Sequence, residues 1–313
     1  MKERYLKQET CNMMRGGAAF IIMLHHLSGY VSYGKPLDFI LNNIGALMAT
    51  VFFFYSGYGL MYNLKHKEGY MNSFVKRRLP NVIFPYLLAN IFYILYQLLT
   101  GSFPGIAYYV SEMRKGYTLV PYSWYVIVII LLYCIFYISF KWLKPEKGII
   151  LCILLNIIYM LFIYKIGFGE WWYNTCFAFS FGIVFSMYYD KANAFLQKKP
   201  VQKFGGFLLL FLMLLVVGKL INQVYVLMLI KSLRAVVFCL CMLYFSMLLQ
   251  KRILPLEFLG NLSFEIYLYQ GFAIGICWEY FNTNILFFTC MTLIATLITS
   301  YVMHKVNNKI HIR

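Results

Sequence analysis

The chain has 313 residues, of which 62% are hydrophobic and only 12% are charged. Soluble domains carry roughly 25% charged residues, so this composition excludes a soluble protein. The net charge of +17 does not indicate nucleic-acid binding, because the Lys and Arg residues form short clusters between apolar runs. We therefore expect an integral membrane protein that has membrane lipids, and no nucleic acid, as partners.

A transmembrane helix needs about 20 mostly apolar residues to cross the hydrocarbon core. Ten apolar runs of about this length follow one another, and strand-like alternation of apolar and polar residues is absent from them. The sequence predicts an all-α integral membrane protein, a polytopic bundle of about ten transmembrane helices in a single domain over 1–313. The first run lacks a small-residue cleavage site and should stay as the first helix. The predicted spans are 13–32, 39–62, 81–100, 123–141, 148–165, 173–190, 204–221, 231–249, 263–281 and 284–304.

The distribution of positive charge predicts the orientation of this bundle. About three quarters of the 28 Lys and Arg residues fall on the side that holds both ends of the chain. By the positive-inside rule both termini are cytoplasmic, and an even number of helices agrees with this because it places both termini on one side. Lys231 and Arg234 lie at the outer end of the eighth run, which could be a re-entrant segment instead. We expect a multi-pass protein of a cell membrane, most simply a bacterial plasma membrane.

The first predicted helix contains three ionisable residues, Arg15, His25 and His26. Such groups inside a membrane segment are costly and are therefore functional candidates. Arg15 and His26 are eleven residues apart, which is close to three helical turns, so both point from one face about 16 Å apart. Arg15 would lie at the cytoplasmic mouth and His26 near mid-membrane. A neutral imidazole can act as a general base. The simpler alternatives are an arginine that snorkels to the headgroups and a hydrogen-bonded core histidine.

Metal binding is not expected. The eight cysteines fall mostly inside apolar runs, where they are typical small buried residues. Three further histidines, His66, His304 and His311, lie at or beyond predicted helix ends. The sequence indicates no metal site and no permanently bound cofactor.

Five short motifs carry a resemblance to a known family. Arg15, Gly16 and Ala18 followed by His26 match R-G-x-A-(x)7-H. The four others follow in the expected order. Residues 52–58 are similar to F-F-x-x-S-G-(Y/F), residues 74–78 resemble a basic F-(x)2-K-R run, residues 123–125 match S-W-(Y/F), and residues 259–268 look like L-G-x-x-S-Y-x-x-Y-L, with Phe264 at the first tyrosine position. Together they resemble the acyltransferase-3 family of integral membrane acyltransferases, over about residues 8–305. Two positions depart from the pattern: Asn81 replaces the second arginine of a frequent R-x-x-R pair, and Gln270 stands where a histidine is common.

The resemblance implies an O-acetyltransferase that moves an acyl group, usually acetyl, from cytoplasmic acetyl-CoA to a hydroxyl of a cell-surface glycan or lipid-linked sugar. Lys76, Arg77 and Arg78 would hold the coenzyme A phosphates by charge-assisted bonds, although topology alone would produce the same cluster. His26 would either deprotonate the acceptor hydroxyl or carry the acyl group itself, and both routes stay open. Because Gln270 replaces a histidine, more of the acid–base chemistry should fall on the first helix.

Four further residues are candidates for substrate binding, each with a structural alternative: His25, Ser56, Tyr58 and Trp124. His25 points about 100° away from His26. The small residues around Ser56 would pack the second helix closely against the first. Trp124 could be an interfacial anchor. Glu265 is expected in the first turn of its helix, where the helix dipole favours a carboxylate.

Two other functions remain open from the sequence. Ten helices with a mid-membrane polar residue also suit a transporter or flippase of a lipid-linked or small polar substrate. Transporters usually show internal repeats and broken helices in matching halves, and the sequence indicates neither. The changes at Asn81 and Gln270 would also fit a non-catalytic relative that binds a lipid intermediate.

Overall fold

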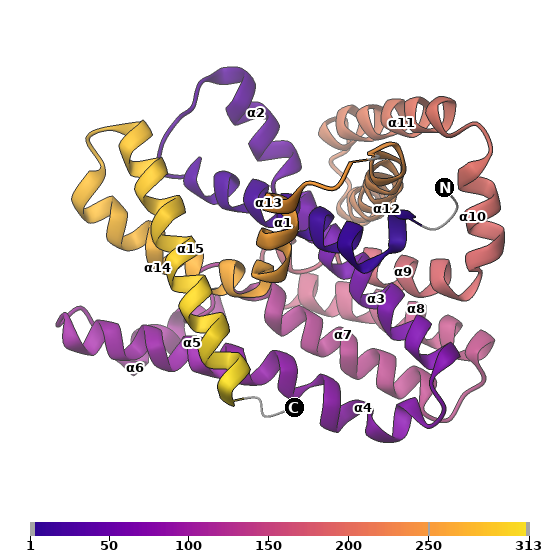
Figure 1. Cartoon of the computed structure of the whole chain (residues 1–313), viewed down its shortest axis with the longest axis horizontal. Coiled ribbons are helices and arrows are strands. Elements are labelled where there is room, and N and C mark those ends of the chain that lie inside the picture. The colour runs from indigo at the N-terminus through magenta and orange to yellow at the C-terminus, as the bar shows by residue number, and fades with distance from the viewer. Residues whose placement is uncertain (1–3, 250, 311–313) are drawn as a thin grey trace.

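A computed structural model describes residues 4–249 and 251–310, and every regular element in them is helical (Figure 1). Three of the long helices, α5, α8 and α11, begin at a proline, a position where a missing N–H costs nothing. The helices before residue 150 are η1 Arg4–Leu6, α1 Gln8–Leu27, α2 Lys35–Ile44, η2 Ala46–Met48, α3 Ala49–His66, α4 Tyr70–Arg78, α5 Pro80–Leu99, α6 Ile106–Arg114, α7 Trp124–Phe140 and α8 Pro145–Lys165. The later helices are η3 Glu170–Trp172, α9 Phe177–Met187, α10 Tyr189–Gln197, α11 Pro200–Leu220, α12 Val224–Leu248, α13 Leu254–Asn261, α14 Ser263–Phe281 and α15 Ile285–Ile310.

All ten predicted runs contain a helix, but six segments of the described chain are long and apolar enough to cross a membrane. α7 is apolar but has only 17 residues. α9 has 11 residues and a rise of about 16 Å, which is short of the roughly 30 Å hydrocarbon core. α1 and α14 are long enough but carry polar and charged side chains on the faces that they turn inward. The six segments are Lys35–His66, Tyr70–Leu99, Pro145–Lys165, Pro200–Leu220, Val224–Leu248 and Ile285–Ile310.

Two predicted boundaries, those of the first and the sixth runs, are wrong. The first helix runs over Gln8–Leu27 rather than 13–32 and ends before Gly29. The run predicted at 39–62 lies within the candidate span Lys35–His66, in which α2 and α3 are separated at Gly45, where a Cβ would lie 2.3 Å from the Cβ of His25. The run at 173–190 holds the shorter α9. The eighth run, by contrast, is one continuous helix of 25 residues, α12, rather than a short re-entrant segment.

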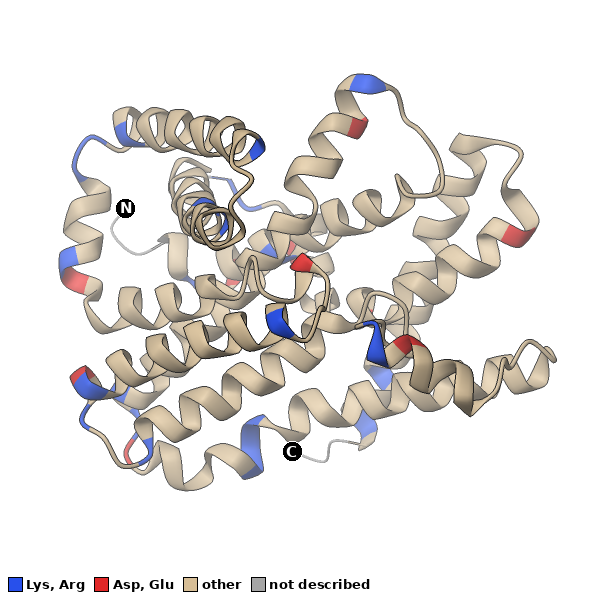
Figure 2. Cartoon of the chain, turned by 180° about the vertical axis from the view of Figure 1, so that it is seen from behind, with Lys and Arg blue, Asp and Glu red and all other residues tan. Residues whose placement is uncertain are grey.

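Large hydrophobic side chains remain exposed on several of the long helices, as expected where lipid replaces water. Examples are Leu95 on α5, Phe162 on α8 and Leu209 on α11. Lys and Arg lie mostly near helix ends, and acidic residues are few (Figure 2). The low share of charged residues is the reason why the composition excluded a soluble protein.

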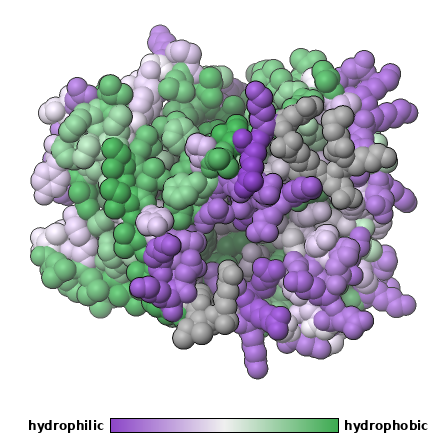
Figure 3. Space-filling model, in the orientation of Figure 1, coloured by the Kyte–Doolittle hydropathy of each residue, from purple (hydrophilic) through white to green (hydrophobic). Residues whose placement is uncertain are grey.

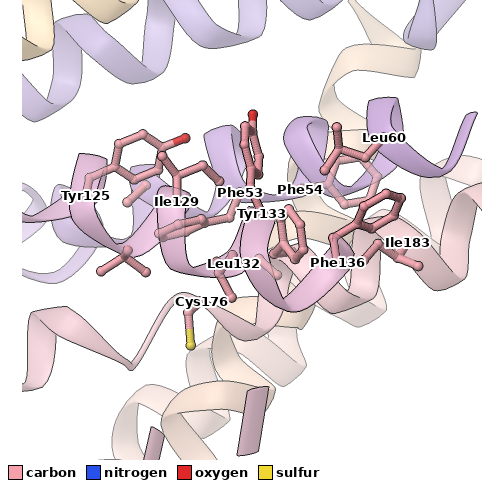
Figure 4. Packing of buried hydrophobic residues seen from close by; sticks show 14 of the residues in the cluster. Phe53, Phe54, Leu60, Tyr125, Ile129, Leu132, Tyr133, Phe136, Cys176 and Ile183 are labelled. Atoms are coloured by element: carbon pink, nitrogen blue, oxygen red, sulfur yellow. The ribbon is translucent and has the colours of Figure 1, made fainter. Parts of the chain in front are cut away.

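An aromatic core joins α3, α7 and α9. Phe53, Phe136 and Phe179 are fully buried there, and Tyr133 packs against them (Figure 4). Gly57 of α3 and Gly182 of α9 let these two helices approach closely, because a Cβ on either would lie about 2 Å from a carbonyl oxygen of the other helix. The sequence predicted that this small-residue segment packs against the first helix. That prediction is wrong, since its partner is α9.

The first helix instead packs against α13 through a second pair of glycines. A Cβ on Gly16 would lie 1.9 Å from the carbonyl oxygen of Leu256, and a Cβ on Gly260 would lie 1.9 Å from that of Asn12. The glycine of the R-G-x-A motif therefore has a packing role. Beside this contact Arg252 donates hydrogen bonds to Glu257 at 2.6 and 2.8 Å, and they hold the pKa of that carboxyl below its usual value.

Candidate active site

A cavity of about 1720 Å³ opens between α1, α3, α4, α5, α7, α14 and α15. Hydrophilic side chains surround a hollow on the face shown in Figure 3, next to a broad hydrophobic area. Such a volume is ample for a ligand larger than most drugs. The cavity brings together helices from both ends of the chain, which sequence order alone does not reveal.

One wall of the cavity is strongly basic. Its six cationic residues come from the start of α1 and from α3 and α4, against two acidic residues, Asp190 and Glu265, in the same lining. A hollow lined mainly by one sign of charge raises the local concentration of oppositely charged ligands. The wall thus suits a polyanion. Its cations are Lys7, Arg15, Lys65, Lys76, Arg77 and Arg78.

Arg15 lies in this wall and is held within its own helix. Its Nη2 donates to Oδ1 of Asn12 at 2.6 Å and its Nε to the carbonyl oxygen of Cys11 at 3.4 Å. Asn12 in turn donates to Oδ1 of Asn261 on α13 at 2.6 Å. The guanidinium is therefore positioned on the cavity side of α1 by the contact between α1 and α13.

The cavity follows α1 from Lys7 to Ile22, a rise of about 22 Å at 1.5 Å per residue. At its deep end Tyr125 and Tyr267 line the wall. The hydroxyl of Tyr267 accepts a hydrogen bond from the backbone N–H of Tyr125 at 3.1 Å and donates one to the carbonyl oxygen of Tyr122. The ring of Tyr122 stacks on His26, with centroids 3.9 Å apart and planes 12° apart. We call these four residues, His26, Tyr122, Tyr125 and Tyr267, the ring layer.

His26 lies one helical turn beyond Ile22 on the same face of α1, as its spacing from Arg15 predicted. It belongs to the last turn of α1, which ends at Leu27. His26 is not part of the cavity lining in the described chain, and Tyr122 lies between it and Tyr267.

The side chain of Gln270 lies beside the imidazole of His26. Gln270 is fully buried. Among the residues that the structure describes, neither Nδ1 of His26 nor Oε1 of Gln270 has a hydrogen-bond partner. A buried polar atom without a partner costs about 1–3 kcal/mol, and such atoms concentrate at functional sites.

Tyr122 is held in an unusual backbone conformation, with φ of 65°. A residue other than glycine rarely occupies this left-handed region, and the cost of about 1–3 kcal/mol persists only where the surrounding structure enforces it. Here the contacts of its carbonyl with Tyr267 and of its ring with His26 provide that enforcement. Sequence reasoning missed Tyr122, because its conformation depends on residues far away in the chain.

The remaining predicted residues divide between the cavity and its surroundings. Ser56 and Tyr58 line the cavity, together with Lys76, Arg77 and Arg78. His25 and Trp124 do not, among the residues described. The side chain of His25 lies against Gly45, the residue that follows α2, because a Cβ on this glycine would lie 2.3 Å from the Cβ of His25. Trp124 is half-buried against Phe53 and Tyr125 behind the deep end.

A buried acid–base pair in the cavity wall was missed. Oε1 of Glu265 lies 3.1 Å from Nδ1 of His304 and accepts a hydrogen bond from Nδ2 of Asn307 at 3.2 Å. Glu265 does lie in the first turn of α14, as predicted, but its hydrogen bonds come from α15. The sequence placed His304 at a helix end, whereas α15 continues to Ile310 and brings His304 into the cavity.

Within the part of the chain that the structure describes, no three His, Cys, Asp or Glu side chains gather in a group able to bind a metal ion. A family model described as an acyltransferase domain, of the acyltransferase-3 type, matches residues 11–304. No curated protein and no solved structure matches the chain. The matched region contains the whole ring layer, most of the basic wall and the Glu265–His304 pair.

Proposed function

The chain belongs to the acyltransferase-3 family and is a membrane acyltransferase, and from this premise we propose that it is an O-acetyltransferase with cytoplasmic acetyl-CoA as donor. The acceptor is a hydroxyl of a cell-surface glycan or lipid-linked sugar. The ten predicted helices all cross or enter the membrane, with both termini cytoplasmic, in a bacterial plasma membrane. The positive-inside distribution of Lys and Arg supports this orientation.

One observation carries the proposal: a deep cavity with a basic wall ends at a ring layer that contains a histidine. In the proposed orientation the mouth, with Lys65, Lys76 and Arg77, faces the cytoplasm, and the ring layer faces the outer side. Coenzyme A combines phosphates with a long neutral arm that ends in the thioester. The phosphates bind the basic wall by charge-assisted hydrogen bonds, and the arm extends along α1 toward Tyr267.

The chemistry at the ring layer consists of one bond broken and one bond formed. Nε2 of neutral His26 takes the proton of the acceptor hydroxyl, the alkoxide oxygen attacks the thioester carbonyl, and the carbon–sulfur bond breaks. The products are an acetyl ester and a thiolate, which takes up one proton to leave as coenzyme A. In the alternative route Nε2 first accepts the acetyl group and then passes it to the hydroxyl. In both routes the side chains of Tyr122 and Tyr267 must move aside, so that the thioester in the cavity can reach His26.

Removing the guanidinium groups of the mouth should weaken donor binding. We expect the Arg77→Ala/Arg78→Ala double variant to bind coenzyme A at least about tenfold more weakly, because charge-assisted hydrogen bonds are lost. The difference in affinity between the variant and the unmodified protein should be smaller at high salt, because salt screens the attraction between the guanidinium groups and the phosphates. Isothermal titration calorimetry with the detergent-solubilised protein measures this. The control is Lys147→Ala, an exposed lysine on the same predicted side but outside the cavity lining. If both variants lose the same affinity for coenzyme A, the basic cluster reflects only membrane topology and has no specific role in donor binding.

The activity itself is tested by expressing the chain in a host that lacks it and measuring ester-linked acetyl groups on the surface polysaccharide. Acetylation above the level of the empty host supports the enzyme. Unchanged acetylation together with transport of a lipid-linked sugar would favour the flippase.

A further inference from the structure

A row of polar side chains runs along the buried face of α15. Thr292, Thr296, Ser300 and His304 follow one another at intervals of four residues, one per turn. The three hydroxyl residues are fully buried. Within the described chain the hydroxyl oxygens of Thr296 and Ser300 have no hydrogen-bond partner, and the same holds for the Tyr269 hydroxyl and Gln270 Oε1 on the facing helix α14. Unpaired polar atoms thus gather at one helix interface.

Two contacts fix the register of this interface. Glu265 meets His304 near one end, and the side chains of Cys277 and Thr292 interact near the other. Because α14 and α15 are antiparallel (Figure 1), this register places Ser300 across from Tyr269, the neighbour of Gln270 in the chain. Along the interface Ser300 therefore lies at a level between Gln270, beside His26, and the Glu265–His304 pair in the cavity wall.

Buried hydroxyl and amide groups are normally satisfied, by protein or by ordered water with two to four polar partners. Ser300 and His304 are one helical turn apart on the same face of α15, and the Ser300 hydroxyl has no hydrogen-bond partner in the described chain, so a water molecule between the two side chains would satisfy it. The interface therefore offers sites for water molecules between the ring layer and the cavity.

The proposed reaction leaves a proton to be moved. The acceptor hydroxyl loses its proton to His26 at the ring layer, and the thiolate that leaves into the cavity needs one. Glu265 and His304 can receive a proton there: His304 Nδ1 faces the Glu265 carboxylate, so Nε2 of the imidazole is the nitrogen left to exchange protons with the cavity.

We propose that Ser300 and Gln270 position water molecules that carry the proton from His26 to the Glu265–His304 pair, from which it passes to the departing thiolate. This inference rests on the proposed acetyl transfer. In it Glu265 and His304 exchange the proton, whereas Ser300 and Gln270 are positioning residues. Gln270 need not titrate, which agrees with the absence of a histidine at this position.

The sharpest test is Ser300→Ala, which removes one buried hydroxyl and little volume. Purified protein in liposomes is assayed with acetyl-CoA and a soluble sugar acceptor. The expected result is a fall in kcat of tenfold or more, an unchanged KM for acetyl-CoA and a larger solvent deuterium isotope effect on kcat. The control is Thr292→Val, which removes an equally buried hydroxyl of the same row on the far side of Gln270, and its kcat should stay within twofold of the unmodified protein.

Acetyl transfer by the unmodified protein is measured first. Its absence would refute the proposed function, and with it the relay's role in that reaction. Normal transfer that Ser300→Ala leaves within twofold would refute the relay alone. Cryo-electron microscopy of the unmodified protein supplies a readout independent of activity: density for ordered water beside Ser300 and Gln270 supports the relay, and a dry, closely packed interface overturns it.

Discussion

Replacing His26 with alanine is expected to lower kcat for acetyl transfer by about 10²–10⁴-fold, the usual contribution of a positioned general base. Binding of coenzyme A should change little, because His26 lies behind Tyr122 and outside the cavity lining of the described chain. Acetyl transfer in liposomes and calorimetric titration with coenzyme A measure the two quantities separately.

His25→Ala is the matched control, since this neighbour lies against Gly45 and outside the cavity lining of the described chain, with its ring centroid 5.5 Å from that of His26. Its activity should stay close to that of the unmodified protein. If both variants lose activity equally, the effect belongs to the end of α1 as a whole, and the assignment of the proton transfer to His26 fails.

The second large effect concerns stability. Gly16→Ala should destabilise the protein by about 3 kcal/mol or more, because the new Cβ would overlap the carbonyl oxygen of Leu256, which is backbone and cannot move aside cheaply. Gly17→Ala places its Cβ in open space and should be neutral or slightly stabilising, since alanine is the better helix former.

Thermal unfolding in detergent compares the two variants. We expect Gly16→Ala to lower Tm by at least ~6 °C relative to Gly17→Ala. A Tm for Gly16→Ala equal to that of the unmodified protein would show that α1 and α13 can separate without loss, and the positioning of Arg15 through Asn12 and Asn261 would then need another explanation.

Local signals in the sequence predicted much of the helical framework. Long apolar runs identified α5, α8 and α11 within a few residues. The common face of Arg15 and His26 followed from helical periodicity, and both lie on the cavity side of α1 or its continuation. The basic residues of α4 were found because their motif is contiguous.

The parts that depended on distant contacts could not be predicted. The break at Gly45 follows from the side chain of His25, and the left-handed Tyr122 follows from Tyr267 and His26. Glu265 and His304 are 39 residues apart, on two helices whose register a single sequence does not specify. Each looks unremarkable alone, and only their contact identifies them.

The ring layer also determines where the membrane's electric field acts. In the proposed orientation the cavity holds water and ions at the cytoplasmic potential, so most of the transmembrane voltage drops over the few ångströms between His26 and Tyr267. A proton that passes from the outer side of this layer into the cavity then moves through most of an inside-negative voltage, which is worth up to about 2.3 kcal/mol per 100 mV. An energised membrane would thereby favour acetyl export, although acetyl transfer itself moves no net charge.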